Sequence, residues 1–205
     1  MSTPELELLD YRRRVHALYA RVRDDADPAH AFAAWVAARD DLFAHHPQSA
    51  LPPEGRAGFA GLSYFPHDPR GQLLADVVAT ERRRYDVPSS DGGPTAFERV
   101  GLARFALDDA PCELELYWLL GYGGGLFVPF ADATSGEETY GAGRYLLDTV
   151  KGADLGARDG RLVLDFNLAY NPSCSYDPRW SCPLAPPANR LLIPVRMGER
   201  HVEPG

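Results

Sequence analysis

Lysine is almost absent from this chain, because only Lys151 among its 21 lysine and arginine residues is a lysine. Acidic residues number 29, which gives a formal net charge of −8 at pH 7. Proteins that bind nucleic acids usually carry a basic face that neutralises phosphates. The only basic clusters, Arg12–Arg14 and Arg82–Arg84, are short and lie near acidic residues, which is typical of a solvated surface. We therefore expect no nucleic-acid partner.

Long hydrophobic runs are also missing. No apolar run approaches the roughly 20 residues of a membrane-spanning helix. The acidic start of the chain, Met1–Glu7, lacks the basic and apolar regions of a signal peptide. These absences predict a cytoplasmic protein without membrane association. Cysteine is scarce, and the three cysteines are expected as thiols in that compartment.

The residues that are present describe a globular chain that begins with helices. A length of 205 residues with 45% hydrophobic and 24% charged residues suits a single structural domain. Apolar residues from Leu8 to Val22 recur at spacings of three and four, which predicts a helix. Asp27 followed by Pro28 is typical of the start of a second helix, which should end before Pro47. Residues 1–46 are thus predicted to be a helical segment.

From Gly55 onward the apolar period changes to two. Cys112–Trp118 alternates as a half-buried antiparallel strand, and Gly121–Gly125 then predicts a hairpin turn before the return strand Leu126–Val128. No helical pattern follows these glycines, so a dinucleotide site is not expected there. The other predicted strands are Phe59–Phe65, Leu73–Thr80, Phe97–Leu107, Thr139–Leu147, Arg161–Asn167 and Arg190–Met197.

This pattern predicts an α+β fold that is mainly β. Two N-terminal helices would pack on an antiparallel β-barrel or bent β-sandwich, because short strands separated by turns rarely form βαβ units. Residues 47–205 would form the β-rich domain, with a C-terminal loop capping one mouth of the barrel.

The C-terminal third holds an unusual density of polar residues. Asp132 opens a segment that resembles an aspartic-protease triplet, but it has an extra residue and no second copy, so that chemistry is excluded. Arg144 lies in an apolar context, where a guanidinium needs a carboxylate partner. Asp165 and Asn167 share one face of a predicted strand. Arg144, Asp132 and Asp165 are therefore candidates for a buried ion network that is either structural or binds a polar ligand.

The segment from Asn167 to Asn189 is predicted to be an ordered, proline-stiffened loop. Loops of this length in compact domains are often functional. Its cysteines, Cys174 and Cys182, are separated by seven residues, which is not the spacing of a zinc site, and no metal site is predicted. Three interpretations stay open for the pair: thiols packed as small apolar groups, a disulfide or redox pair, and a metal or nucleophile site.

Several segments resemble a known family. They are Asp132–Leu146, Asp165–Asn167, Ala169–Pro172, Cys174, Cys182–Leu184 and Pro187–Leu191, with His46–Ser49, Leu51 and Phe59–Phe65 upstream. This signature is similar to that of the bacterial domain-of-unknown-function 1684 family. The chain departs from it at Ala50, where proline is usual, and at Ala188, where a glutamate often precedes the asparagine. The second departure argues against a mechanism that needs that acid.

The resemblance implies no established activity or cofactor, but it strengthens the view that the polar residues work as a unit. The first hypothesis is a small-molecule enzyme or binder whose ligand is polar or anionic and occupies a barrel mouth. Asp132 and Asp165 would act as acid, base or orienting groups, and Arg144 would pair with the ligand. The expected ligand-binding residues are Tyr140, Asn167, Asn171, Cys174, Cys182 and Asn189.

Two alternatives use the same residues. In the first, the protein is structural or interacts with partners, and the polar cluster only locks the C-terminal loop. In the second, Cys174 and Cys182 form a thiol-redox or metal site. Catalysis, the cofactor and the oligomeric state are left open by the sequence.

Overall fold

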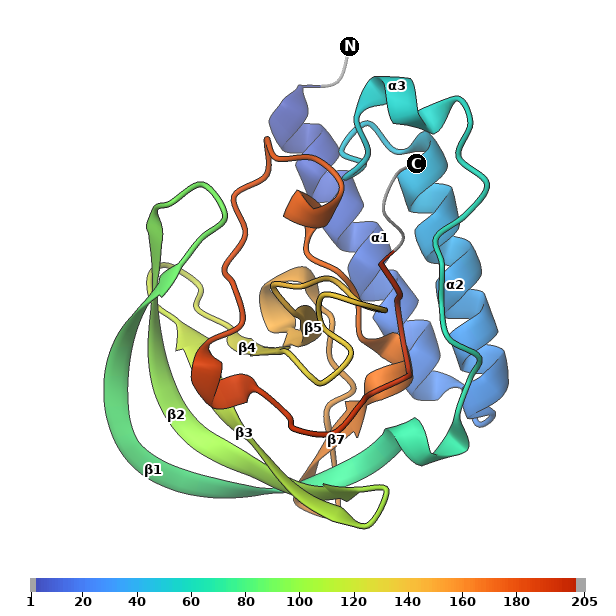
Figure 1. Ribbon diagram of the computed structural model, residues 1–205. Helices are drawn as coiled ribbons and strands as arrows, with labels where there is room; N and C mark the ends of the chain where they lie inside the picture. The colour runs from blue at the N-terminus through green and yellow to red at the C-terminus, as the bar shows by residue number, and fades with distance from the viewer. Residues whose placement is uncertain (1–2, 202–205) are drawn as a thin grey trace.

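Two long helices open the chain, as predicted. The computed structural model describes residues 3–201, in which α1 spans Pro4–Asp24 and α2 spans Pro28–His45. The Asp27 side chain caps α2 by accepting from the backbone N–H groups of Ala29 and His30. Both helices lie side by side along one flank of the molecule (Figure 1). The Asp27–Pro28 capping signal and Pro47 therefore predict both ends of α2 correctly.

Seven strands form one antiparallel sheet. The sheet order is β5-β4-β3-β2-β1-β7-β6, and neighbouring strands pair antiparallel throughout. The strands are β1 (Gln72–Pro88), β2 (Pro94–Leu107), β3 (Ala110–Leu119), β4 (Leu126–Phe130), β5 (Arg144–Asp148), β6 (Ala157–Arg158) and β7 (Arg161–Asp165). The long strands β1 and β2, at the middle of this order, are strongly curved (Figure 1).

Short helical turns connect these elements. The segments are α3 (Pro53–Arg56) and the 3-10 turns η1 (Pro69–Gly71), η2 (Thr149–Lys151), η3 (Phe166–Leu168), η4 (Ser173–Ser175) and η5 (Pro187–Asn189). Two of the 3-10 turns, η4 and η5, fall in the segment Asn167–Asn189 that was predicted as a stiff loop, and η3 overlaps its start. This segment runs between the sheet and the helices (Figure 1).

The mainly β assignment is confirmed, but a closed barrel is not. The sheet ends at β5 and β6, and no ladder joins these two strands within residues 3–201. C-terminal segments instead occupy the concave side of the sheet (Figure 1). A barrel mouth therefore does not describe where the polar residues gather.

Two predicted strands are wrong. Phe59–Phe65 and Arg190–Met197 make only isolated bridges, from Tyr64 to Glu199 and from Arg190 to Ala131. Pro194 has no N–H group to donate to a ladder, and the carbonyl of Val195 accepts from the Arg144 guanidinium. Side-chain partners thus replace strand pairing in this segment. The predicted Thr139–Leu147 strand begins only at Arg144.

Two apolar clusters fill the interior. One lies within the curved sheet and includes Leu114, Phe166 and Val195. The other joins the helices to the sheet, with Trp35 of α2 in the same cluster as Tyr117 of β3. The N-terminal helices therefore share a core with the β-rich part of the chain.

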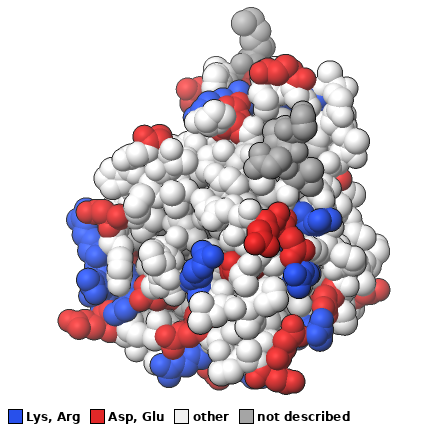
Figure 2. Space-filling model, viewed as in Figure 1, with Lys and Arg blue, Asp and Glu red and all other residues white. Residues whose placement is uncertain are grey.

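Charges of both signs are interspersed on the face seen in Figure 2, mainly over its lower half. The described helices include none that is long and apolar enough to cross a bilayer.

Candidate functional site

Arg144 and Asp132 form a fully buried ion pair. Their side chains are 1% and 0% exposed, and Arg144 Nη2 lies 2.9 Å from Asp132 Oδ2. Arg144 comes from the first position of β5, and Asp132 follows β4, so the pair closes the end of this hairpin. The expected pairing of these two residues is present.

The remaining partners of the pair are all internal. Arg144 donates to the backbone carbonyls of Val195, Met197 and Glu199, and Asp132 Oδ1 accepts from the backbone and hydroxyl of Thr134. Burial lowers the pKa of Arg144, against the opposing effect of Asp132. The two charges therefore fasten the C-terminal segment to the β4–β5 hairpin.

A second buried ion pair was missed by sequence reasoning. Arg39 of α2 lies 2.7 Å from Glu199, whose side chain is 1% exposed and also accepts from the Asn171 backbone N–H. Burial raises the pKa of Glu199, although Arg39 opposes the shift. The available signal was Arg39 itself, which lies four residues after Trp35 on the apolar face of its helix.

Asn189 occupies the gap where β3 and β4 separate. Its Oδ1 accepts from the Glu115 N–H at 2.8 Å, and its Nδ2 donates to the carbonyls of Glu115 and Pro129. The side chain, which is 0% exposed, thus replaces the missing strand pairing between β3 and β4. This contact accounts for an asparagine at this position.

Asp165 does not join the Arg144 pair. It accepts from the backbone and side chain of Asn167 and, at 3.3 Å, from Gln72 Nε2. Asn167 in turn exchanges two hydrogen bonds with the backbone of Asp68. Within the described residues Asp165 forms no salt bridge with Arg144, so the expected three-residue network is a pair.

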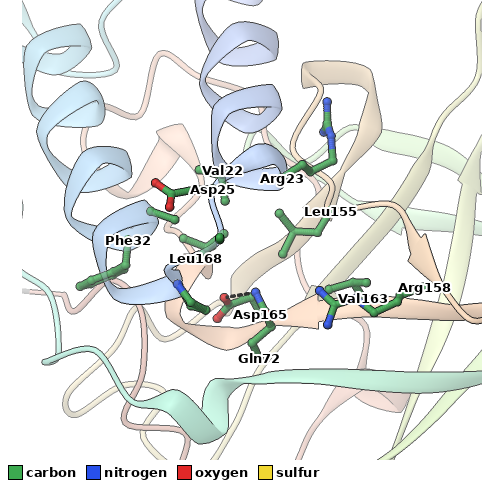
Figure 3. Close-up of a pocket in the computed structure, with 13 residues that line it drawn as sticks. Val22, Arg23, Asp25, Phe32, Gln72, Leu155, Arg158, Val163, Asp165 and Leu168 are labelled. Atoms are coloured by element: carbon green, nitrogen blue, oxygen red, sulfur yellow. Dashed lines mark hydrogen bonds between the residues drawn. The ribbon is translucent and has the colours of Figure 1, made fainter.

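Asp165 instead borders a cavity of about 230 Å³. Figure 3 shows Asp165 beside Gln72 on one side of the cavity. Arg23 and Asp25 lie at the end of α1, and Arg158 comes from β6. Burial raises the pKa of Asp165, while the Asn167 hydrogen bonds work against the shift. This cavity, which we call the Asp165 cavity, has charged groups of both signs.

A different cavity lies between α1, α2 and the loop that follows Asn171. It has a volume of about 170 Å³, and we call it the α1 cleft. Its lining residues are Leu8, Tyr11, Arg12, Arg39, Phe43, Gln48, Lys151, Tyr170, Asn171, Ser173, Trp180, Ser181 and Cys182. Two of the predicted ligand-binding residues, Asn171 and Cys182, thus come together here.

The α1 cleft is lined by three cationic side chains and no carboxylate. Arg39 is paired with Glu199, and Lys151 lies 3.0 Å from Asp148. Two of the cations thus have carboxylate partners that do not line the cleft. Arg12 is exposed, and the described residues include no salt-bridge partner for it. Arg12 therefore leaves the cleft with one unneutralised positive charge, in a protein whose net charge is −8.

One residue of the α1 cleft carries a buried acceptor without a partner. Asn171 is 3% exposed, and its Nδ2 donates to the Arg200 carbonyl. Its Oδ1 is buried and has no hydrogen-bond partner. Buried polar atoms usually have partners, so this oxygen is an exception inside the wall of the cleft.

Cys174 and Cys182 are neighbours at the edge of this cleft. The backbone N–H of Cys174 donates to Cys182 Sγ at 3.3 Å, and both residues are free thiols. Tyr140 completes the group, since its hydroxyl lies 3.9 Å from Cys174 Sγ. Burial raises the pKa of Tyr140 to about 12.

Hydrogen bonds from Cys182, Ser90 and Tyr140 lower the pKa of Cys174 to about 6, against desolvation. The pKa of Cys182 is raised, because its thiol donates a hydrogen bond to the Cys174 thiolate. No cluster of three or more histidine, cysteine or acidic residues that could hold a metal occurs in residues 3–201.

The predicted site residues therefore fall into distinct places. Arg144, Asp132 and Asn189 hold backbone segments together, Asp165 borders one cavity, and Asn171 and Cys182 line another. Lys151 and Arg12 were not singled out as site residues. Lys151 was conspicuous only as the single lysine, and no local pattern distinguishes Arg12 from Arg13.

The comparisons with known proteins identify a family without an assigned activity. Residues 57–200 match the family model described as "Protein of unknown function (DUF1684)". This match confirms the resemblance drawn from the C-terminal motifs. A similar solved structure is the solution NMR structure of the uncharacterized protein from gene locus rrnAC0354 of Haloarcula marismortui. It is 38% identical, with a TM-score of 0.59 over 80% of this chain and 89% of that chain. None of the curated proteins matches this chain.

Proposed function

The chain belongs to the DUF1684 family of proteins of unknown function, and we propose that it binds a small organic anion in the α1 cleft. The observation that carries this proposal is the lining of the cleft, which combines three cations with no acidic side chain. Small-ligand sites are typically apolar cavities with a few convergent polar groups, and this lining fits that description. A net negative protein that keeps one cavity positive favours anions there over the rest of its surface.

The other lining residues specify the ligand further. Tyr11, Tyr170 and Trp180 offer aromatic surface, which favours a flat apolar group on the ligand. The polar side chains of Gln48 and Ser173 in the lining favour a ligand that also carries a hydroxyl group. A hydroxylated aromatic carboxylate has all three features.

A second candidate function is purely structural, and the Asp132–Arg144 pair favours it. The described hydrogen bonds of both side chains go to internal groups, and neither residue lines the α1 cleft or the Asp165 cavity. We assign these residues to the scaffold that holds the cleft wall. Asp165 remains our candidate for acid–base chemistry in its own cavity.

Titration with 4-hydroxybenzoate, followed by NMR of the backbone amides, tests the binding proposal. We expect a dissociation constant on the order of 1 mM or below, because ten heavy atoms of moderate efficiency supply that much free energy. Shifts should concentrate at Tyr11, Lys151 and Asn171. The neutral isostere 4-hydroxybenzamide is the control, and equal affinity for the two compounds would contradict an anion site.

A further inference from the structure

We propose that Cys174 and Cys182 form a dithiol site that reacts with small-molecule disulfides, with Cys174 as the attacking thiol and Cys182 as the resolving thiol. This activity is independent of anion binding, because it needs the two sulfur atoms and an oxidant but no ligand in the α1 cleft. The inference starts from the geometry of the loop that carries both residues.

The fold brings the two thiols together and keeps them there. The 3-10 turn η4 includes Cys174, and its backbone N–H points at Cys182 Sγ over 3.3 Å. Cys182 is fixed from the other side, because its N–H donates to Ser90 Oγ and its carbonyl accepts from the Ser90 N–H. The two sulfurs are therefore held as neighbours by backbone contacts on both sides, without a covalent bond.

The segment between the two cysteines is anchored near its Cys182 end. Trp180 Nε1 donates to the Ala50 carbonyl at 3.2 Å, and Arg179 donates to the Ser49 carbonyl at 3.1 Å. The bend that pairs the thiols is thus formed before any oxidation. A disulfide between Cys174 and Cys182 would close a loop whose two ends this bend already brings into contact.

The surroundings distinguish the roles of the two thiols. Cys174 is partly exposed and Cys182 is 6% exposed, so an external disulfide reaches Cys174 first. The Tyr140 hydroxyl lies 3.9 Å from Cys174 Sγ and can donate to its thiolate. A thiolate stabilised by such donors is the nucleophilic form of cysteine at neutral pH. Cys182 keeps its proton until Cys174 has reacted.

The reaction balances without a metal or cofactor. The Cys174 thiolate attacks one sulfur of the external disulfide, forms a mixed disulfide and releases one thiolate. Cys182 then loses its proton to solvent and attacks Cys174 Sγ, which forms the internal disulfide and releases the second thiolate. Overall, the two protein thiols are oxidised and one small disulfide is reduced to two thiols.

Oxidised glutathione with mass spectrometry tests this assignment on the full chain. We expect the Cys112→Ser variant to lose two hydrogens, link Cys174 to Cys182 and retain no glutathione. Cys182→Ser should accumulate one glutathione on Cys174, while Cys174→Ser should react at least tenfold more slowly at residue 182. In Cys182→Ser and Cys174→Ser, Cys112 is the internal control, because burial raises the pKa of its thiol.

Alkylation with iodoacetamide at a series of pH values provides a measurement that does not depend on disulfide formation. The Cys174 rate should reach half its maximum below the ordinary cysteine pKa of ~8.5, and Tyr140→Phe should move this midpoint upward. The proposal is overturned if Cys174 and Cys112 react with glutathione disulfide and iodoacetamide at the same rates, or if Cys182→Ser and Cys174→Ser behave alike.

Discussion

At the scale of single residues, the Arg144 guanidinium stabilises the fold through partners that are entirely internal. Arg144→Met should destabilise the protein by about 3–5 kcal/mol, because it leaves the Asp132 carboxylate buried without its partner. Urea unfolding followed by circular dichroism measures the change. Arg104→Met, which breaks the exposed pair with Glu113, is the matched control and should cost roughly 0–1 kcal/mol. Equal losses in the two variants would contradict the structural role.

Asp165 should make the stability of the folded protein depend on pH. Burial raises its pKa in the folded state, so the folded chain holds this proton at pH values where the unfolded chain has released it. Stability contributed by the protonated group is therefore lost as pH rises from the unfolded pKa through the folded pKa. Asp165→Asn removes this titration and keeps an oxygen that can accept from the Asn167 N–H.

The melting temperatures of the wild type and Asp165→Asn, measured between pH 4 and pH 7, test this direction. The difference between variant and wild type should move in favour of the variant as pH rises. A difference that stays constant, or that moves in favour of the wild type, would show that burial does not raise the pKa of Asp165.

At the scale of elements, the gap between β3 and β4 depends on the Asn189 side chain. Asn189→Ala should destabilise the protein by roughly 2–4 kcal/mol, because buried backbone groups of Glu115 and Pro129 lose their partners. Hydrogen exchange should show a local effect. The Glu115 amide should exchange faster, whereas the Leu119 amide, which donates to the Gly125 carbonyl, should be unchanged in native conditions. Equal acceleration of both would point to general loosening instead.

Local signals in the sequence predict the elements that depend on local chemistry. The Asp27 cap, the β3 alternation and the glycine-rich turn before β4 are examples, because each is determined within a few residues. Arg190–Met197 is the contrasting case. Its apolar pattern resembles a strand, but its carbonyls accept from Arg144, which lies about fifty residues away in the sequence. Such long-range partners cannot be identified from one sequence.

The candidate site shows the same limit. The polar C-terminal third was expected to act together because its residues are close in sequence. The structure separates Asp165 from Arg144 and places Asn171 and Cys182 beside Arg12 and Lys151, which come from α1 and η2. The positive lining of the α1 cleft is therefore a property of the tertiary fold.

At the scale of the whole molecule, the net charge of −8 opposes anion binding except where cations converge. Arg12 is the most informative cation of the α1 cleft, because its replacement leaves no buried carboxylate without a partner. Its neighbour Arg13 is also exposed and does not line the cleft, so Arg13→Gln changes the net charge equally.

The affinity for 4-hydroxybenzoate, measured by calorimetry for the wild type, Arg12→Gln and Arg13→Gln, tests the central claim most directly. Loss of one partly exposed cation near a bound carboxylate should weaken binding by about threefold to tenfold, a free-energy change of roughly 1 kcal/mol. Arg12→Gln should show this loss, and Arg13→Gln should bind within about twofold of the wild type, since it lies outside the cleft. Equal weakening in both variants, or no binding by the wild type, would contradict an anion site in the α1 cleft.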